Sequence, residues 1–326
     1  MELGLALPHT GPLASASFVR EFAATADACG FASLWAVDHV AVPHHIDSPY
    51  PLGESPRVLP DGAVNRWMAP SYEQLTTLAF VAGVTRRTRL GSGVSVLTLR
   101  NPVVHARMLA TLDVYSGGRL VCGVGAGWLR EEAEAIGMPW GERGARTEEH
   151  VALLRALWSA PGDEVSFAGR FYSVPPIHPE PRPVQRPGPP ILIGGHGDAA
   201  LARAGRIGDG WFAGPMSPAR AAELWPRVLA AARAAGRDRG TLTLSVAASF
   251  AIRADQPAGS RQGLASGARP EAAIDSGDVA TLAERVRSYR AIGAHELRLG
   301  IVAASSEAVL TSIAPLAAAL LPVAAG

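Results

Sequence analysis

The chain has 326 residues, of which 48% are hydrophobic, so it is long enough to bury a core as one large α/β barrel or as two smaller domains. Its 30 basic and 29 acidic side chains are scattered and give a formal net charge of +1. This balance excludes a basic face for nucleic acid and a polybasic patch for a membrane, and small neutral or mildly anionic molecules are the expected partners.

The chain contains no lysine. This absence excludes Schiff-base catalysis, a pyridoxal-phosphate lysine and a Walker A lysine, so any catalytic cation is arginine or histidine. Cys29 and Cys122 fall in apolar patterns, which predict reduced core residues rather than a disulfide or a zinc site. The first residues lack the pattern of a secretory signal, which predicts a cytoplasmic protein.

Strand and helix patterns alternate along the chain. Apolar and β-branched runs predict strands at residues 3–7, 33–37, 88–97, 120–124, 190–194, 210–213, 242–252 and 296–301. Helical periodicity predicts helices at residues 17–29, 72–84, 102–115, 145–159, 198–207, 218–235, 279–292 and 306–321. A strand followed by a helix, repeated through the chain, is typical of a (β/α)8 TIM barrel, here a single domain over residues 1–326. A doubly wound sheet is the alternative.

Three stretches rich in proline, glycine and small residues interrupt this alternation, at 44–69, 161–188 and 254–277. In a barrel we expect them to be insertion segments between strand ends and helices at the C-terminal mouth, long enough to cover a pocket. The uncharged tail has the length of a membrane span, but Pro315 and Pro322 interrupt it, which favours a packed final helix.

Asp38 and His39 follow the second predicted strand, at the end where barrel enzymes place catalytic groups. An adjacent carboxylate and imidazole suit proton transfer, because histidine titrates near neutral pH. The structural alternative is that Asp38 caps the following turn and His39 hydrogen-bonds a backbone carbonyl. No set of His, Cys, Asp and Glu residues has metal-ligand spacing, so no metal site is predicted.

Glycines end two of the predicted strands. Gly125 and Gly127 follow the fourth strand before a helix start, and Gly194 and Gly195 follow the fifth. Such glycines leave backbone N–H groups unobstructed near a helix dipole, which favours phosphate or carboxylate, although close packing also explains them. A Rossmann fingerprint is excluded because Trp128 stands where its third glycine is required.

Five ordered motifs carry a family resemblance. They are F-x-S-L-W-x-x-D-H-x-x-x-P at 31–43, R-L-G-x-G-V at 89–94, R-N-P-x-x-x-A-R-x-x-A-T-L-D at 100–113, S-G-G-R-L-x-x-G-V-G-A-G-W at 116–128, and P-P-I-L-I-G-G at 189–195 with D-G-W at 209–211. Together they resemble the bacterial luciferase-like monooxygenase superfamily, and within it they look most like the coenzyme F420-dependent oxidoreductases. The resemblance covers about residues 2–215.

The resemblance implies a flavin or 5-deazaflavin across the barrel mouth, with its ring over the third strand. It implies a non-prolyl cis peptide at Gly93–Val94 against the face of the ring, for which an ordinary β-bulge is the alternative. It places Asp38 and His39 at the pyrimidine side of the ring, where His39 exchanges a proton with the substrate. The residues that match the segments contacting the ribityl–phosphate tail are Gly125, Ala126, Gly127, Gly194, Gly195 and His196.

The chain departs from the sugar-phosphate dehydrogenases of that family. Trp128 stands where they carry a catalytic glutamate, and lysine is absent. Tyr50, Trp67 and Met68 in the segment 44–69 predict a more apolar pocket, or alternatively core packing under a long loop.

The expected function is F420-dependent transfer of a hydride between cofactor C5 and a small organic substrate, with Asp38 and His39 as the catalytic pair and His39 as general acid or base. One alternative is a two-component FMN-dependent monooxygenase, because only a true flavin, with nitrogen at position 5, forms the peroxide that monooxygenation needs. Another is a non-catalytic flavin-binding paralogue. The family resemblance also implies a homodimer.

Overall fold

The computed structural model describes residues 1–50, 70–159, 162–251, 273–275 and 279–326. Parallel strands form a closed barrel in the order β1–β2–β3–β4–β7–β8–β9–β11, which closes where β11 pairs with β1. The barrel strands are β1 (Glu2–Ala6), β2 (Ser33–Ala36), β3 (Arg89–Val96), β4 (Leu120–Gly125), β7 (Ile191–Gly194), β8 (Gly210–Pro215), β9 (Thr243–Ala251) and β11 (Glu296–Val302). The fold is therefore the predicted (β/α)8 barrel.

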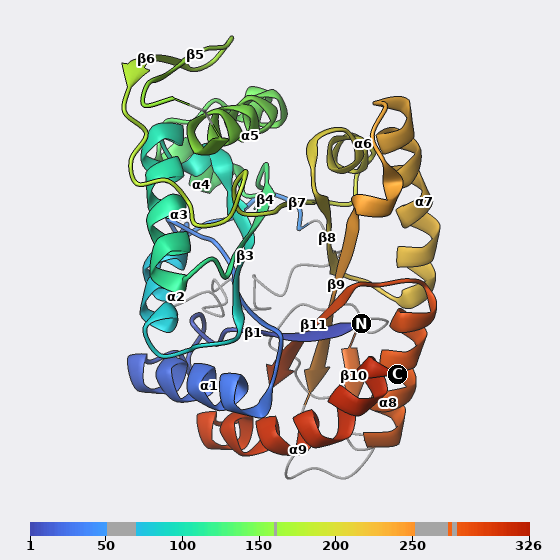
Figure 1. Ribbon diagram of the computed structural model, residues 1–326. Coiled ribbons are helices and arrows are strands. Elements are labelled where there is room, and N and C mark those ends of the chain that lie inside the picture. The colour runs from blue at the N-terminus through green and yellow to red at the C-terminus, as the bar shows by residue number, and fades with distance from the viewer. Residues whose placement is uncertain (51–69, 160–161, 252–272, 276–278) are drawn as a thin grey trace.

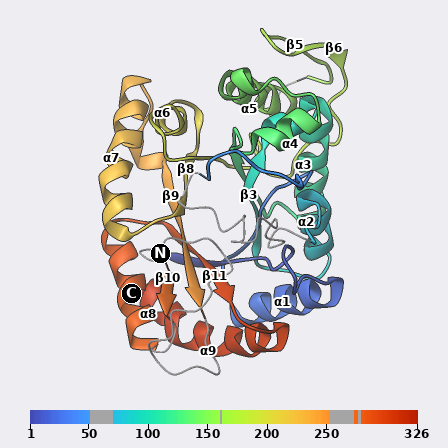
Figure 2. The same cartoon turned by 180° about the vertical axis from the view of Figure 1, so that it is seen from behind.

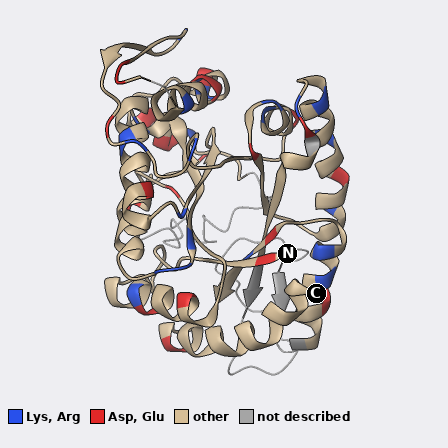
Figure 3. Ribbon diagram, in the orientation of Figure 1, with Lys and Arg blue, Asp and Glu red and all other residues tan. Residues whose placement is uncertain are grey.

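Helices surround the strands (Figure 1). They are α1 (Ala16–Cys29), α2 (Gln74–Ala82), α3 (Pro102–Ser116), α4 (Arg130–Ala135), α5 (Arg143–Ser159), α6 (Asp198–Ile207), α7 (Pro218–Ala234), α8 (Val279–Ala291) and α9 (Ser306–Ala325). Short 3-10 turns are η2 (Leu97–Leu99), η3 (Trp140–Glu142) and η4 (Arg239–Thr241). All of the predicted helices are present, and α4 is an addition. Charged residues of both signs are spread along the helices of this outer layer (Figure 3).

The last helix packs against the barrel, as predicted. Within the described ranges α9 is the one helix long and apolar enough to cross a membrane. It lies against α1, α8 and β1, with Val309, Ile313 and Leu320 buried. The amino group of Met1 donates to the carbonyl of Ala324 at 3.1 Å, so the two ends of the chain meet.

The predicted insertion segments differ in their positions. Segment 44–69 follows β2 and segment 254–277 follows β9, so each comes after the carboxyl end of a strand, and most of each lies outside the described residues. Segment 161–188 instead connects α5 to β7, so it is a helix-to-strand connection and not the mouth insertion that was expected. It contains a hairpin of β5 (Val165–Ala168) and β6 (Ser173–Ile177) that lies beside α5, outside the ring of helices (Figure 2). Proline-rich composition alone does not distinguish the two ends of a barrel.

Inside the barrel, large aromatic side chains lie beside glycine positions, which have no side chain. Trp35 on β2 and Phe212 on β8 pack together, with ring centroids 5.0 Å apart. A Cβ atom on Gly91 would overlap the Trp35 ring, so this ring requires glycine there. A Cβ atom on Gly123 would overlap the carbonyl oxygen of Ser92 on the neighbouring strand, so the close approach of the two backbones requires that glycine.

Both cysteines are free thiols, as predicted. Cys122 is buried on β4, and burial raises the pKa of its thiol. Cys29 is half-buried at the end of α1.

Candidate active site

The carboxylate of Asp38 is buried beyond the end of β2 and is held by three donors. Nη1 and Nη2 of Arg100 bind its two oxygens at 2.6 and 2.8 Å, and the N–H of Val96 donates to Oδ2 at 2.9 Å. Arg100 also donates to Oε1 of Glu73, the N-cap residue of α2, at 2.7 Å. Asp38 thus does not cap the following turn, but joins the ends of β2 and β3 to α2.

The charge of Arg100 is secured by its partners. Burial alone lowers the pKa of a guanidinium, but the hydrogen bonds and charges of Asp38 and Glu73 outweigh it and raise the pKa of Arg100 above its usual value. The bidentate geometry also fixes the plane of the Asp38 carboxylate. Asp38 is therefore placed to position the backbone around His39.

His39 is paired with a residue that the sequence analysis did not identify. Its Nδ1 lies 3.1 Å from Oε2 of Glu132, and the His39 side chain is 13% exposed. A carboxylate can only accept, so Nδ1 carries the proton and donates. No hydrogen bond to Nε2 is found among the described residues, which leaves that nitrogen available to a bound molecule.

Glu132 is itself held rigidly. It is 2% exposed in the first turn of α4, and its Oε1 accepts the N–H groups of Val40 at 2.6 Å and Ala41 at 3.0 Å. The neighbouring Glu131 accepts the N–H groups of Asp47 and Ser48 at 2.6 and 2.8 Å. The two carboxylates therefore attach the chain after β2 to α4. In the sequence, Glu131 and Glu132 resemble the acidic residues common in the first turn of a helix, so nothing indicates that they bind the chain after β2.

Aromatic side chains stand beside His39. The ring of Trp128 lies 6.1 Å from that of His39 and 5.5 Å from that of Tyr50, in edge-to-face geometry. This supports an apolar wall at this side of the mouth. Trp67 and Met68, which were expected in the same wall, lie outside the described residues.

The third strand carries the cis peptide that the family resemblance implies, between Gly93 and Val94. The pairing of β3 with β4 shifts register here, between Ser92 and Ser95. The Val94 side chain fits between two other strands, since a Cβ atom on Gly125 or Gly194 would lie 2.9 or 2.8 Å from its methyl groups. Packing against Val94 therefore explains why these two positions are glycine.

The helix after β7 fits a phosphate better than the helix after β4. Side chains cap the first turns of α1, α2, α3, α7 and α9, namely Ser15, Glu73, Asn101, Ser217 and Ser305. The N-cap residues of α4 and α6 make no side-chain cap hydrogen bond, but at α4 the hydroxyl of Ser48 accepts the N–H of Arg130 at 3.0 Å. The first turn of α4 already holds Glu131 and Glu132, which oppose an anion. At α6 the acidic side chain of the first turn, Asp198, is paired with Arg227 at 2.7 Å, and a Cβ atom on the N-cap residue Gly197 would meet no atom within 4 Å, which leaves room for a phosphate beside the first N–H groups.

The other predicted tail residues lie at these two strand ends. Gly127 and Gly195 adopt positive φ angles of 79° and 112°, which other residues rarely adopt. Nε2 of His196 accepts the N–H of Gly214 at 3.1 Å, and burial, with a smaller contribution from Arg220, lowers the pKa of His196. His196 is therefore neutral, and its Nδ1–H, for which no acceptor is found in the described part of the chain, can donate to an anionic or neutral acceptor.

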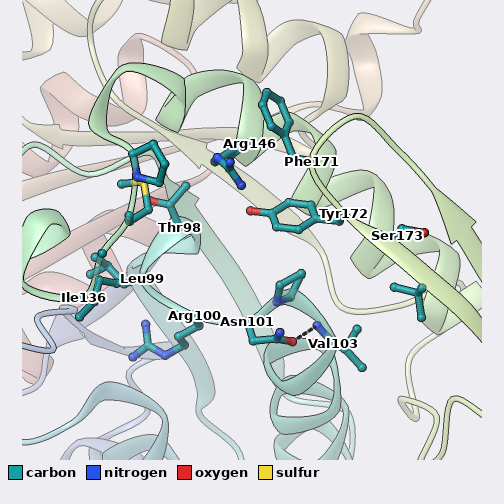
Figure 4. Close-up of a pocket in the computed structure, with 15 residues that line it drawn as sticks. Thr98, Leu99, Arg100, Asn101, Val103, Ile136, Arg146, Phe171, Tyr172 and Ser173 are labelled. Carbon is teal, nitrogen blue, oxygen red and sulfur yellow. Dashed lines mark hydrogen bonds between the residues drawn. The ribbon is translucent and has the colours of Figure 1, made fainter.

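A separate cavity of about 520 Å³ is lined by Arg100 but not by His39 (Figure 4). Tyr172 and Thr98 also line it. The Thr98 hydroxyl is buried without a hydrogen-bond partner in the described part of the chain, as are one nitrogen each of His105 and His150. His150 contacts Tyr172 at a ring distance of 5.9 Å. No group of three metal-ligating side chains occurs in the described ranges, here or elsewhere.

A parallel barrel with an oriented histidine and an accessible helix N-terminus at the carboxyl ends of its strands has the architecture of a barrel enzyme. The chain belongs to the luciferase-like monooxygenase family, whose model matches residues 1–292. This confirms the resemblance carried by the sequence motifs, and the family supports an oxidoreductase or monooxygenase activity.

Individual relatives cover most of the chain. It is 33% identical over 246 residues to a phthiodiolone/phenolphthiodiolone dimycocerosates ketoreductase of Mycobacterium tuberculosis, covering 74% of this chain and 60% of that protein. The monooxygenase RslO1 from Streptomyces bottropensis has 25% identity and a TM-score of 0.72, with 99% of each chain covered. An F420-dependent secondary alcohol dehydrogenase in complex with an F420–acetone adduct has 18% identity and a TM-score of 0.77, covering 99% of this chain and 98% of that one, which shows a shared fold.

Proposed function

We propose that the protein is an F420-dependent oxidoreductase that transfers a hydride between the cofactor and the carbonyl or alcohol carbon of a small organic substrate. The observation that carries this proposal is the His39–Glu132 pair. It provides a fixed imidazole whose Nε2 has no partner among the described residues, next to an apolar wall. Carbonyl reduction needs one proton besides the hydride, and a histidine in this arrangement can supply it.

The residues at the mouth have different functions in the proposed reaction. Glu132 accepts the Nδ1–H of His39, so the neutral ring can take a proton at Nε2 from a hydroxyl during oxidation, and the imidazolium can give the Nε2 proton to a carbonyl oxygen during reduction. Asp38 is engaged with Arg100 and Val96, so its part in catalysis is to position the chain that carries His39. This distribution separates the predicted pair into one proton-transfer group and one positioning group.

The residues fit a deazaflavin or flavin. Such a cofactor supplies or accepts the hydride at position 5 of its ring. The first turn of α6, with Gly195, His196 and Gly197, would hold its phosphate, and the Gly93–Val94 bulge would lie against its ring. The fit rests on the uncapped α6 terminus and on the open space at Gly197.

The substrate class follows from the mouth and from one relative. Trp128 and Tyr50 offer aromatic surface and the chain has no lysine, so a sugar phosphate is a poor match and an apolar ketone, aldehyde or secondary alcohol is a good one. The relative from M. tuberculosis is named as a ketoreductase, which supports the carbonyl class.

One observation favours a second candidate. The monooxygenase RslO1 is more similar in sequence, at 25% identity, than the F420-dependent alcohol dehydrogenase, at 18%. An FMN-dependent monooxygenase would use the same mouth, with His39 near the reacting oxygen.

We further propose a cytoplasmic homodimer.

The test compares cofactors directly. The purified protein is titrated with F420 and with FMN, and then reduced F420 is mixed with a panel of apolar ketones and aldehydes. We expect tighter binding of F420 and recovery of its absorbance as the carbonyl is reduced. Tight FMN binding with oxygen consumption and a hydroxylated product would support the monooxygenase, and stoichiometric binding without turnover would support a non-catalytic flavin-binding protein.

A further inference from the structure

A buried arginine in the barrel interior has no part in the proton transfer described above. Arg298 on β11 is 6% exposed. Its Nε donates to the hydroxyl of Ser245 at 2.8 Å, and its Nη2 donates to the carbonyl oxygens of Ser245, at 3.1 Å, and of Ala213. These bonds from β8 and β9 fix the guanidinium in one orientation.

Arg298 forms one end of a buried dipole. Glu296 precedes it by two residues on the same strand, and the Ser245 hydroxyl joins them by donating to Oε2 of Glu296 at 2.5 Å. Because β11 runs towards the mouth, the positive group is the end nearer to it. Burial lowers the pKa of Arg298 to about 9, although the charge of Glu296 raises it.

A column of contacts leads from Arg298 to the cis bulge. The guanidinium carbon lies 3.2 Å from the centroid of the Phe212 ring. The Phe212 ring also lies against the third strand, since a Cβ atom on Gly93 would be 2.8 Å from the ring. Val94 packs against the same interior cluster, which includes Trp35 and Phe212. The charge is therefore separated from the bulge by one aromatic ring.

We propose that Arg298 is a positioning residue that, through Phe212 and the Gly93–Val94 bulge, favours the reduced form of the cofactor over the oxidised form. This inference rests on the proposed function. Hydride transfer to a flavin or deazaflavin ring bound here would give a product with one more negative charge than the oxidised ring, until a proton followed. A fixed positive charge stabilises that product, and in an interior with little water its effect extends further than at the surface. Glu296 opposes it less because it lies deeper in the barrel.

The test measures dissociation constants of the oxidised and the reduced cofactor separately, using whichever of F420 and FMN the wild type binds. In Arg298→Met we expect the Kd of the reduced form to rise about tenfold more than that of the oxidised form. Arg298→Lys keeps the charge and should keep the wild-type ratio even if both affinities fall. Arg233→Met, on the exposed side of α7, is the matched control and should change neither constant.

The double variant Arg298→Met/Glu296→Gln avoids an unpaired buried carboxylate and decides the question if Arg298→Met does not fold. It should show the same loss of preference for the reduced form. An equal change of both constants in the methionine variants, or no change, would overturn the inference and leave the proposed function intact. A wild type that binds neither cofactor would overturn the proposed function, and this inference with it.

Discussion

Replacing Glu132 with glutamine tests the proton-transfer site without changing the size of the side chain. Glutamine keeps an oxygen that can accept the N–H groups of Val40 and Ala41, now 2.6 and 3.0 Å from Oε1. The other oxygen, 3.1 Å from His39 Nδ1, becomes an NH2 group that can only donate. His39 must then accept at Nδ1, so its proton moves to Nε2 and the nitrogen that faces the mouth can no longer act as a neutral base.

The size of the effect follows from the bond that is lost. A hydrogen bond to a charged group contributes about 1.5–3 kcal/mol, and each 1.36 kcal/mol is a factor of ten in rate, so hydride transfer should slow by roughly 10- to 150-fold. The melting temperature should change little because the backbone N–H groups keep an acceptor.

The assay is single-turnover reduction of oxidised F420 by a secondary alcohol, the direction in which His39 acts as the base, measured across pH. Glu131→Gln is the matched control, since it alters the adjacent carboxylate, which binds Asp47 and Ser48 and not His39. It should keep the wild-type rate and pH profile. If Glu132→Gln also kept them, or if both variants slowed the reaction equally, Glu132 would only anchor the loop.

Four further predictions concern other parts of the molecule. His39→Ala should slow hydride transfer by about 10²–10⁴-fold with little change in cofactor Kd, and wild-type single-turnover rates in this variant would make His39 structural. Gly197→Asp should raise the melting temperature by capping α6 while weakening cofactor binding through charge repulsion, with Gly197→Asn as the neutral control; unchanged binding of the aspartate variant would remove α6 from the phosphate site. Burial lowers the pKa of His150 to about 3, so between about pH 6.5 and 3 the unfolded chain binds a proton at this residue that the folded protein does not bind. The free energy of unfolding therefore decreases as pH falls through this window. In urea unfolding, His150→Gln should reduce this decrease by about 1.4 kcal/mol per pH unit, and an unchanged slope would contradict the assignment. Val104, Met108 and Tyr115 form an exposed apolar face on α3, with Tyr115 70% exposed, so Tyr115→Asp should convert the proposed homodimer to monomers in sedimentation, and a variant that stays dimeric would place the interface elsewhere.

The barrel was predictable because its pattern is local. Every barrel strand coincides with an apolar run in the sequence, and every long helix with helical periodicity of its apolar residues. The observed strand ends therefore differ from the predicted ends by only one or two residues. By contrast, α4 has six residues and an N-cap residue, Leu129, without a capping side chain, and the hairpin in 161–188 is a polar, proline-rich excursion. Neither has a local signature strong enough to identify it.

The site was predictable only in part, because its pairs join distant segments. His39 and Glu132 are 93 positions apart, and nothing near either residue points to the other. On β11 the usual alternation is inverted, since Leu297 and Leu299 face the helices while Glu296 and Arg298 are buried in the interior. Charged residues in a strand are normally assigned to solvent, so this buried pair requires knowledge of the closed barrel.

The most direct test of the central claim follows the hydride itself. F420 carrying two deuterium atoms at its reduced C5 is mixed with the protein and a ketone under ¹⁸O2, a parallel mixture contains reduced FMN in its place, and the products are analysed by mass spectrometry and NMR. The account predicts one deuterium at the carbinol carbon, with no oxygen from O2 in the product. A product that carries ¹⁸O from labelled O2 and no deuterium would contradict it and assign the protein to monooxygenation.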